Sequence, residues 1–238
     1  MNPAIALLSL VLAFSPAALA EREAERDLMV LQLQRHGSGS ARITDEAVLA
    51  AMRAVPRHRF VPRAQRSRAY ADSPLPIGHG QTISQPYIVA LMTQLAAVAP
   101  GMKVLEVGTG SGYQAAVLAQ LTDRVYTLEI ISPLARGVAE RFKRLGLDTI
   151  SASEGDGYYG WEQHAPFDRI VVTAAAAHIP PPLVEQLKPG GRMVIPVGPK
   201  WGAQRLMLVL KDEAGQVTTR SILPVRFVPL TGGGDAAP

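Results

Sequence analysis

The sequence contains no cysteine, and this absence excludes three kinds of site at once. A chain without a thiol has no disulfide framework, no cysteine nucleophile and no thiolate metal ligand. Its five histidines are scattered, without the spacing typical of a metal site, so we expect no bound metal. No long low-complexity tract is present, and 47% of the 238 residues are hydrophobic. This length and composition predict one substantial core.

An apolar stretch occupies residues 1–20 and ends at Ala20, just before a charged run. The pattern is typical of a secretory signal peptide, although no Lys or Arg precedes the apolar part. A mis-assigned start or a disordered leader is the alternative. The stretch is too short to span a bilayer comfortably, so we expect no stable membrane insertion. We therefore predict a signal peptide at 1–20, a single domain with an N-terminal helical extension at 21–231, and a disordered tail at 232–238.

The formal charge of +4 is locally concentrated in one basic run. Its members are Arg53, Arg57, Arg59, Arg63, Arg66 and Arg68. A basic run can mark a nucleic-acid surface, but this one lacks the regular aromatic interleaving that base stacking needs. We predict a solvated helix face and no nucleic-acid partner.

The most informative segment is Val104–Tyr113, which runs from an apolar strand through three alternating glycines into a helix-forming sequence. A dinucleotide-binding turn places its third glycine where this chain has Tyr113, which weakens a pyrophosphate interpretation. The next β-rich run ends in Glu129, whose carboxylate could accept hydrogen bonds from both ribose hydroxyls. S-adenosyl-L-methionine therefore fits better than NAD. The alternative is a glycine turn that merely joins a strand to a helix.

Strands and helices alternate through most of the chain, which predicts a mostly parallel, doubly wound α/β sheet of the Rossmann-like kind. We expect a helix at 44–54, a Pro- and Gly-rich loop at 70–87 and a helix from there to about 99. Strands are expected at 104–107, 125–129, 149–152 and 167–173, with helices at 113–121 and from 132. The segments 191–197, 205–211 and 217–228 are expected to form an antiparallel C-terminal edge, because no crossover helix separates the last two.

Ligands of such sheets bind beyond the carboxyl ends of the strands. The loops at 108–112, at Glu129, at 154–157 and from Thr173 onward should therefore converge. Asp156 follows the third strand and could accept the amino hydrogens of an adenine. An ordinary Asp-Gly turn is the alternative for Asp156.

Several motifs together resemble the protein-L-isoaspartate O-methyltransferase family. They are Pro74–Gly78, Gly80–Pro86, Val104–Gln114, Phe167-Asp168 and Phe227–Leu230, and the resemblance covers about residues 43–231. It implies a class I methyltransferase that moves a methyl group from S-adenosyl-L-methionine to the free α-carboxylate of isoaspartyl residues. That methylation begins the repair of damaged proteins and peptides through a methyl ester and a succinimide. The resemblance also implies a monomer in the cytoplasm.

The resemblance assigns a catalytic role to Ser84 and substrate binding to Thr82, Ile83 and Ser84. Ser84 could instead cap the helix that starts near Pro86. The expected cofactor-binding residues are Glu106, Gly108, Thr109, Gly110, Ser111, Gly112, Glu129, Asp156 and Gly157. A carboxylic acid is ionised at pH 7, so the acceptor needs no general base and positioning is the main catalytic task.

Three other functions remain to be weighed. A nucleic-acid amino-methyltransferase would carry an acid or amide, two prolines and an aromatic residue after the fourth strand, and residues 173–182 do not fit. A methyltransferase with another small-molecule or peptide acceptor, or a non-catalytic binding module, stays open. The cellular location also stays open, because the apolar leader indicates export whereas S-adenosyl-L-methionine is made in the cytosol.

Overall fold

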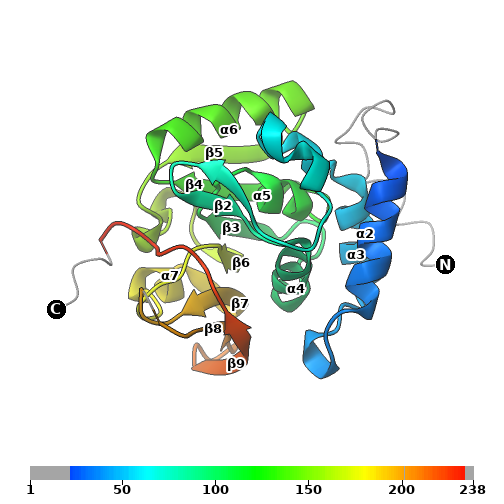
Figure 1. Cartoon of the computed structure of the whole chain (residues 1–238). Helices are drawn as coiled ribbons and strands as arrows, with labels where there is room; N and C mark the ends of the chain where they lie inside the picture. Colours follow the sequence, from blue (N-terminus) through cyan, green and yellow to red (C-terminus); the bar gives the residue numbers. More distant parts are fainter. Residues whose placement is uncertain (1–21, 201, 234–238) are drawn as a thin grey trace, which may run out of the picture.

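The computed structural model describes residues 22–200 and 202–233. The expected signal peptide and residues 234–238 of the expected tail lie outside the described residues. A seven-stranded sheet in the order β5-β4-β3-β6-β7-β8-β9 forms the centre (Figure 1). Its parallel strands are β3 (Lys103–Val107), β4 (Arg124–Glu129), β5 (Ile150–Glu154), β6 (Phe167–Val172) and β7 (Leu187–Val197). The antiparallel edge consists of β8 (Gln204–Lys211) and β9 (Val217–Val225), which confirms the predicted α/β class.

Alternate residues of the strands point to opposite faces of the sheet, and each face has its own core. Val104, Val125 and Val171 belong to the core on the face covered by α2 (Glu23–Arg35), α3 (Glu46–Ala54), α4 (Pro86–Ala96), α5 (Tyr113–Leu118) and α6 (Ser132–Leu145). Leu105 and Val172 belong to the second core, which includes Leu183 of α7 (Pro181–Glu185). The near-continuous apolar strands are thus buried on both sides.

Side-chain caps and prolines set the ends of the helices that flank the site. Asp45 caps α3 by accepting hydrogen bonds from the main-chain N–H groups of Ala47 at 2.9 Å and Val48 at 3.2 Å. Helix α4 begins with Pro86, and Asp72 accepts from the N–H of Tyr87 at 2.9 Å. The cap of α4 therefore comes from Asp72, so Ser84 does not have the capping role considered as its alternative.

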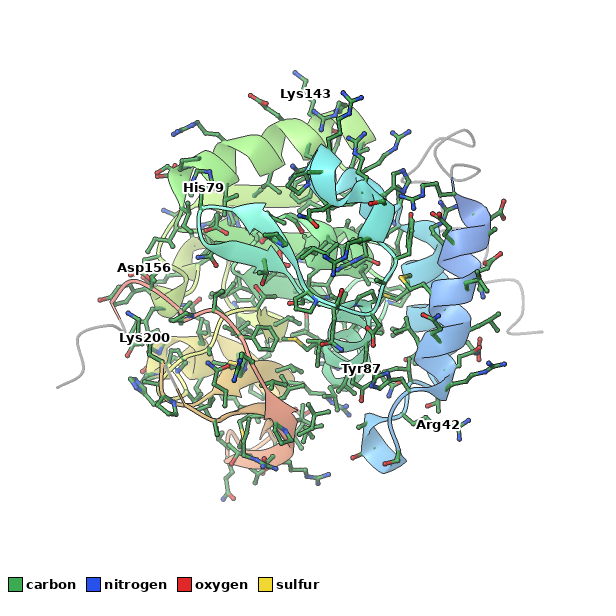
Figure 2. All side chains as sticks on the ribbon, in the orientation of Figure 1. Arg42, His79, Tyr87, Lys143, Asp156 and Lys200 are labelled. Carbon is green, nitrogen blue, oxygen red and sulfur yellow. The ribbon has the colours of Figure 1, made fainter. Side chains whose placement is uncertain are left out.

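Two expectations about the first third of the chain need correction. The expected loop at 70–87 contains an antiparallel hairpin of β1 (Leu75–Gly78) and β2 (Gln81–Ile83), with His79 at its tip (Figure 2). The prolines and glycines of this segment interrupt the alternation of apolar and polar residues that would have predicted strands there. The expected solvated basic face is wrong at Arg57, which is 0% exposed, because the segment after α3 turns inward through the short 3-10 helix η3 (Arg57–Arg59).

The remaining short 3-10 helices are η2 (Gly39–Ala41), η4 (Arg63–Arg68), η5 (Gly157–Tyr159) and η6 (Glu162–His164). Within residues 22–200 and 202–233, no helix has both the length and the apolar character needed to cross a membrane.

Candidate active site

Three hollows meet at the carboxyl ends of the parallel strands, and Thr82 and Thr173 line all three. The outer hollow, of about 450 Å³, lies between the β1–β2 hairpin, the start of α4 and residues 223–228. The glycine hollow is bounded by Gly108, Glu129 and Gly157 on one side and by residues 228–231 on the other. The inner hollow lies between them and reaches Ser84, Glu106 and Gln114. The expected convergence of loops is confirmed.

The glycine turn between β3 and α5 requires glycine for its conformation and its space. Gly108 and Gly112 have φ values of +91° and +82°, in the left-handed region that side chains disfavour. A Cβ atom on Gly108 would lie 2.6 Å from Oγ1 of Thr173, and one on Gly112 would lie 2.6 Å from Val138 and Phe142. The main chain of the turn is therefore open toward the glycine hollow and closely packed behind it.

Glu129, at the end of β4, joins the two neighbouring turns. Its side chain is buried, and its Oε2 accepts from the N–H of Gly110 at 2.8 Å while Oε1 accepts from the N–H of Ile131 at 2.9 Å. Each carboxylate oxygen has two acceptor sites, so both oxygens can still accept hydrogen bonds from a ligand. Its place in the glycine hollow suits the hydroxyl groups of a ribose.

Glu106 is 0% exposed and reaches the inner hollow from β3. Thr127 donates to its Oε2 and in turn lies 2.6 Å from the hydroxyl of Thr109, whereas Oε1 has no hydrogen-bond partner among the described residues. Burial raises the pKa of Glu106 to about 8, and the charge of Glu129 adds to this effect, whereas the hydrogen bond from Thr127 and the main-chain N–H of Ala115 oppose it. The unpartnered oxygen suits a cationic or hydrogen-bond-donating group of a ligand.

Asp156 already has main-chain partners on both carboxylate oxygens. Its Oδ1 accepts from the N–H of Tyr158 at 2.9 Å, and its Oδ2 accepts from the N–H of Gly233 at 2.7 Å. The C-terminal segment runs from β9 across the strand ends to reach this position (Figures 1 and 2). Gly232 and Gly233 belong to the predicted tail at 232–238, which stays a prediction, and Gly233 lies beside η5 through its contact with Asp156.

The segment that follows β9 is held in place by hydrogen bonds at Phe227, Val228 and Leu230. Gln204 clamps Phe227 by accepting from its N–H at 2.6 Å and donating to its carbonyl at 3.1 Å. Val228 accepts from the N–H of Ala175, and Leu230 donates to the carbonyl of Ala175, both at 2.8 Å. We call residues 228–233 the strap, because they bound the glycine hollow and end on Asp156.

The predicted acceptor residues lie at the boundary of the outer and inner hollows. Ser84 lines both hollows and is half-buried, Thr82 is exposed and lines all three, and Ile83 is buried. Arg57 donates from Nη2 to the carbonyl of Ser84 at 2.7 Å, which fixes the main chain there. The hollows thus bring together the expected residues 82–84, Glu106, 108–111, Glu129 and Gly157. Gly112 and Asp156 line none of the three hollows, because Gly112 packs against Val138 and Phe142 and Asp156 precedes Gly157.

Thr173 was expected only as the start of a converging loop. Its hydroxyl donates to the carbonyl of Gly108 at 2.5 Å and lies 3.0 Å from that of Val107, and it lines every hollow. The available signal was its position directly after an apolar strand, where the first polar residue lies at the ligand edge of the sheet.

Comparisons with known proteins show the family of the chain. The family model described as Protein-L-isoaspartate(D-aspartate) O-methyltransferase (PCMT) matches residues 24–235. Protein-L-isoaspartate O-methyltransferase 2 of Polaromonas sp. (strain JS666) is 66% identical over 188 residues, which cover 79% of this chain and 89% of that protein. Protein-L-isoaspartate O-methyltransferase 1 of Cupriavidus necator is 59% identical over 217 residues, covering 90% of this chain and 84% of that protein.

Solved structures resemble the whole fold. A protein-L-isoaspartate O-methyltransferase superposes with a TM-score of 0.79 at 29% identity, covering 88% of this chain and 67% of that one. A second structure, a protein-L-isoaspartate O-methyltransferase from Plasmodium falciparum in complex with S-adenosyl-L-homocysteine, gives a TM-score of 0.74 at 27% identity. It covers 87% of this chain and 98% of that one.

Proposed function

The chain belongs to the protein-L-isoaspartate(D-aspartate) O-methyltransferase family. We propose that it methylates the free α-carboxylate of L-isoaspartyl residues in damaged proteins and peptides, and that the reaction takes place in the three joined hollows. The enzyme is a carboxyl O-methyltransferase that uses S-adenosyl-L-methionine. One observation supports the assignment of residues: the glycine hollow and the outer hollow meet at Thr82 and Thr173. A cofactor and a peptide bound in these two hollows would meet there.

The residues of the glycine hollow fit S-adenosyl-L-methionine. The open main chain at Gly108–Gly112 admits close approach of a ligand, and Glu129 offers acceptor sites for the ribose hydroxyls. Glu106, with Thr109 and Ser111 beside it in the inner hollow, offers an unpartnered oxygen to the ammonium group of the methionine part. Gly157 and Val107 line the same hollow and pack closely, since a Cβ on Gly157 would lie 2.3 Å from Val107, and we propose that the adenine lies against this part of the wall. The cofactor supplies an electrophilic methyl group on a sulfonium ion.

We propose that the Ser84 hydroxyl and the main chain at Thr82 and Ile83 bind the acceptor carboxylate. We call these three residues the acceptor grip. Asp72 caps α4, which leaves the Ser84 hydroxyl for a ligand in the outer or inner hollow. The outer hollow is lined by Leu223, Pro224, Val225 and Phe227, and it opens to the surface, so it can receive an extended peptide. An isoaspartyl linkage places the α-carboxylate on a short branch, which can reach Ser84 while the main chain stays in the outer hollow.

Positioning is the main contribution of these residues to the reaction. The acceptor carboxylate is ionised at neutral pH, so no side chain has to remove a proton. Holding a carboxylate oxygen in line with the methyl group recovers part of the entropic barrier, which is of the order of several kcal/mol for well-oriented reactants. The attacking oxygen gains the methyl group, the carbon–sulfur bond breaks with its electron pair remaining on sulfur, and a neutral ester and a neutral thioether result.

Methyl transfer from labelled S-adenosyl-L-methionine tests this function directly. The acceptors are a short isoaspartyl peptide and the same peptide with ordinary aspartate. We expect label on the isoaspartyl peptide alone. Equal labelling of both peptides, or cofactor binding without labelling of either, would contradict the proposed acceptor.

Three finer assignments belong to the same proposal. We propose that residues 21–231 act as one catalytic domain, because residues of this range line all three hollows, and that the enzyme is a monomer. We propose a cytoplasmic site of action because the cofactor is made there, with export through residues 1–20 as the alternative. N-terminal sequencing of the protein purified from its own cells distinguishes these locations, since cleavage after Ala20 indicates export.

A further inference from the structure

Arg57 is a buried cation that the reaction scheme above does not use. It is 0% exposed, and among the described residues it forms no ion pair with a carboxylate. Burial lowers its pKa to about 10, with the nearby Tyr113 and Asp72 opposing the shift, so the guanidinium remains charged at neutral pH. A buried charge without a direct ion pair is costly, which calls for a function.

The contacts of Arg57 connect the two halves of the site. Its Nε donates to the carbonyl of Ala69 at 2.8 Å, and its Nη2 donates to the carbonyl of Ser84 at 2.7 Å. The guanidinium lies over the ring of Tyr113, with its central carbon 4.8 Å from the ring centre. Tyr113 begins α5 directly after the glycine turn, so Arg57 lies between the acceptor segment and the cofactor turn.

One donor group of Arg57 makes no hydrogen bond of good geometry. Nη1 is buried and has no acceptor within hydrogen-bond distance and angle among the described residues, although the Tyr113 side chain also stabilises the charged guanidinium. The two hydrogen bonds that do form both end on main-chain carbonyls, which carry no compensating charge. The positive charge therefore lies beside the segment that binds the acceptor, and an anion bound there would add to the counter-charge of Asp72.

We propose that Arg57 is a positioning and specificity residue, which fixes the main chain of Ser84 and biases the acceptor site toward a carboxylate over a neutral group. This inference rests on the proposed role of Ser84 as the acceptor grip. Two consequences can be separated. The fork, by which we mean the two hydrogen bonds from the guanidinium to the carbonyls of Ala69 and Ser84, orients Ser84 and affects kcat. The charge favours anionic over neutral peptides and affects binding.

The test measures the affinity of two peptides in the presence of S-adenosyl-L-homocysteine, which cannot donate a methyl group. One is an isoaspartyl peptide, and the other carries a carboxamide in place of the free α-carboxylate. We define the charge preference as the ratio of their dissociation constants. Arg57→Gln removes the charge but keeps a donor, and the charge preference should fall about tenfold, as expected for an interaction with a charged group. An unchanged preference would overturn the proposal.

Arg57→Lys keeps the charge but loses the fork. The charge preference should stay within about twofold of the wild type, while kcat falls about tenfold because an ammonium group does not bridge the carbonyls of Ala69 and Ser84 as the guanidinium does. Wild-type kcat and KM in this variant would also overturn the proposal. If Arg57→Gln does not fold, this second variant still decides.

Arg169→Gln is the matched control. Arg169 is also buried and also donates to main-chain carbonyls, to Ala97 at 3.2 Å and Asp168 at 2.7 Å, but it lies near the start of β6, away from the ligand edge. It should lower the melting temperature without changing the charge preference. An equal loss of preference in Arg169→Gln would mean that general destabilisation explains the effect, and the proposal would fall.

Ser84→Ala separates the two proposals. If this variant has wild-type kcat and KM, the assigned grip is wrong and the inference on Arg57 loses its basis. If Ser84→Ala is impaired while both Arg57 variants keep wild-type kinetics and charge preference, only the inference on Arg57 fails.

Discussion

Replacing Glu106 with Gln should make the stability of the protein less sensitive to pH. The side chain is fully buried, and its pKa is raised from 4.5 to about 8. In the unfolded chain the carboxyl ionises near pH 4.5, whereas in the folded protein it keeps its proton until about pH 8. The folded state thus binds more protons over this interval, so the free energy of unfolding falls as pH rises through it.

The magnitude follows from the interval between the two pKa values. A difference of one unit corresponds to about 1.4 kcal/mol, so the raised pKa of Glu106 costs up to about 5 kcal/mol of stability above pH 8 and nothing below pH 4.5. Glu106→Gln keeps the shape but cannot ionise. Its free energy of unfolding relative to the wild type should therefore rise steadily between pH 5 and pH 8.

Urea unfolding at half-unit steps of pH measures this difference, with Glu162→Gln as a control because Glu162 is exposed. The slope of the difference matters more than its absolute value, since the amide also changes the hydrogen bond from Thr127. A difference between Glu106→Gln and wild type that is constant from pH 5 to pH 8.5 would refute the argument. It would mean that the folded protein tolerates an ionised Glu106 without cost.

Three further changes test the proposed site. Ser84→Ala should lower kcat/KM for an isoaspartyl peptide by about 10- to 100-fold, the value of a hydrogen bond to a charged acceptor, and unchanged steady-state rates would contradict the grip. Glu129→Gln should weaken S-adenosyl-L-homocysteine binding by about tenfold in calorimetry, because a neutral amide is a poorer acceptor for ribose hydroxyls, and an equal affinity would exclude that role. Ending the chain after Thr231 removes the Gly233 N–H from Asp156 and should tighten S-adenosyl-L-homocysteine binding about threefold, whereas weaker binding would show that the strap supports the cofactor.

The sheet and the glycine turn could be predicted from the sequence because they depend on local patterns. Mostly apolar strand segments such as Val104–Val107 alternate with helical segments, and parallel strands with crossover helices have few possible arrangements. The three short C-terminal strands lacked room for a last crossover helix, and the antiparallel β8 and β9 confirm that prediction. Glu129 was located because the end of a strand identifies the ligand edge of the sheet.

Contacts between distant segments could not be predicted in the same way. The bond from Gly233 to Asp156 joins residues that are 77 positions apart, and neither the Asp-Gly turn nor the glycine-rich tail carries a pattern that indicates it. The partners of Thr173 are likewise distant in sequence, namely the main-chain carbonyls of Val107 at the end of β3 and of Gly108 in the turn that follows. Such contacts depend on the path of the whole chain, so a single sequence read without its fold leaves them undetermined.

Arg57 shows a different limit, since here a local signal existed and pointed the other way. Counting charges places six arginines in one basic run, and solvated positions are the usual outcome for such residues. Yet Pro56 ends α3 one residue earlier, so Arg57 cannot belong to that helix face, and the flanking Val55, Phe60 and Val61 are all buried. A charged residue set among apolar neighbours just beyond a helix end is therefore a candidate for burial, and burial without an ion pair makes it a candidate for function.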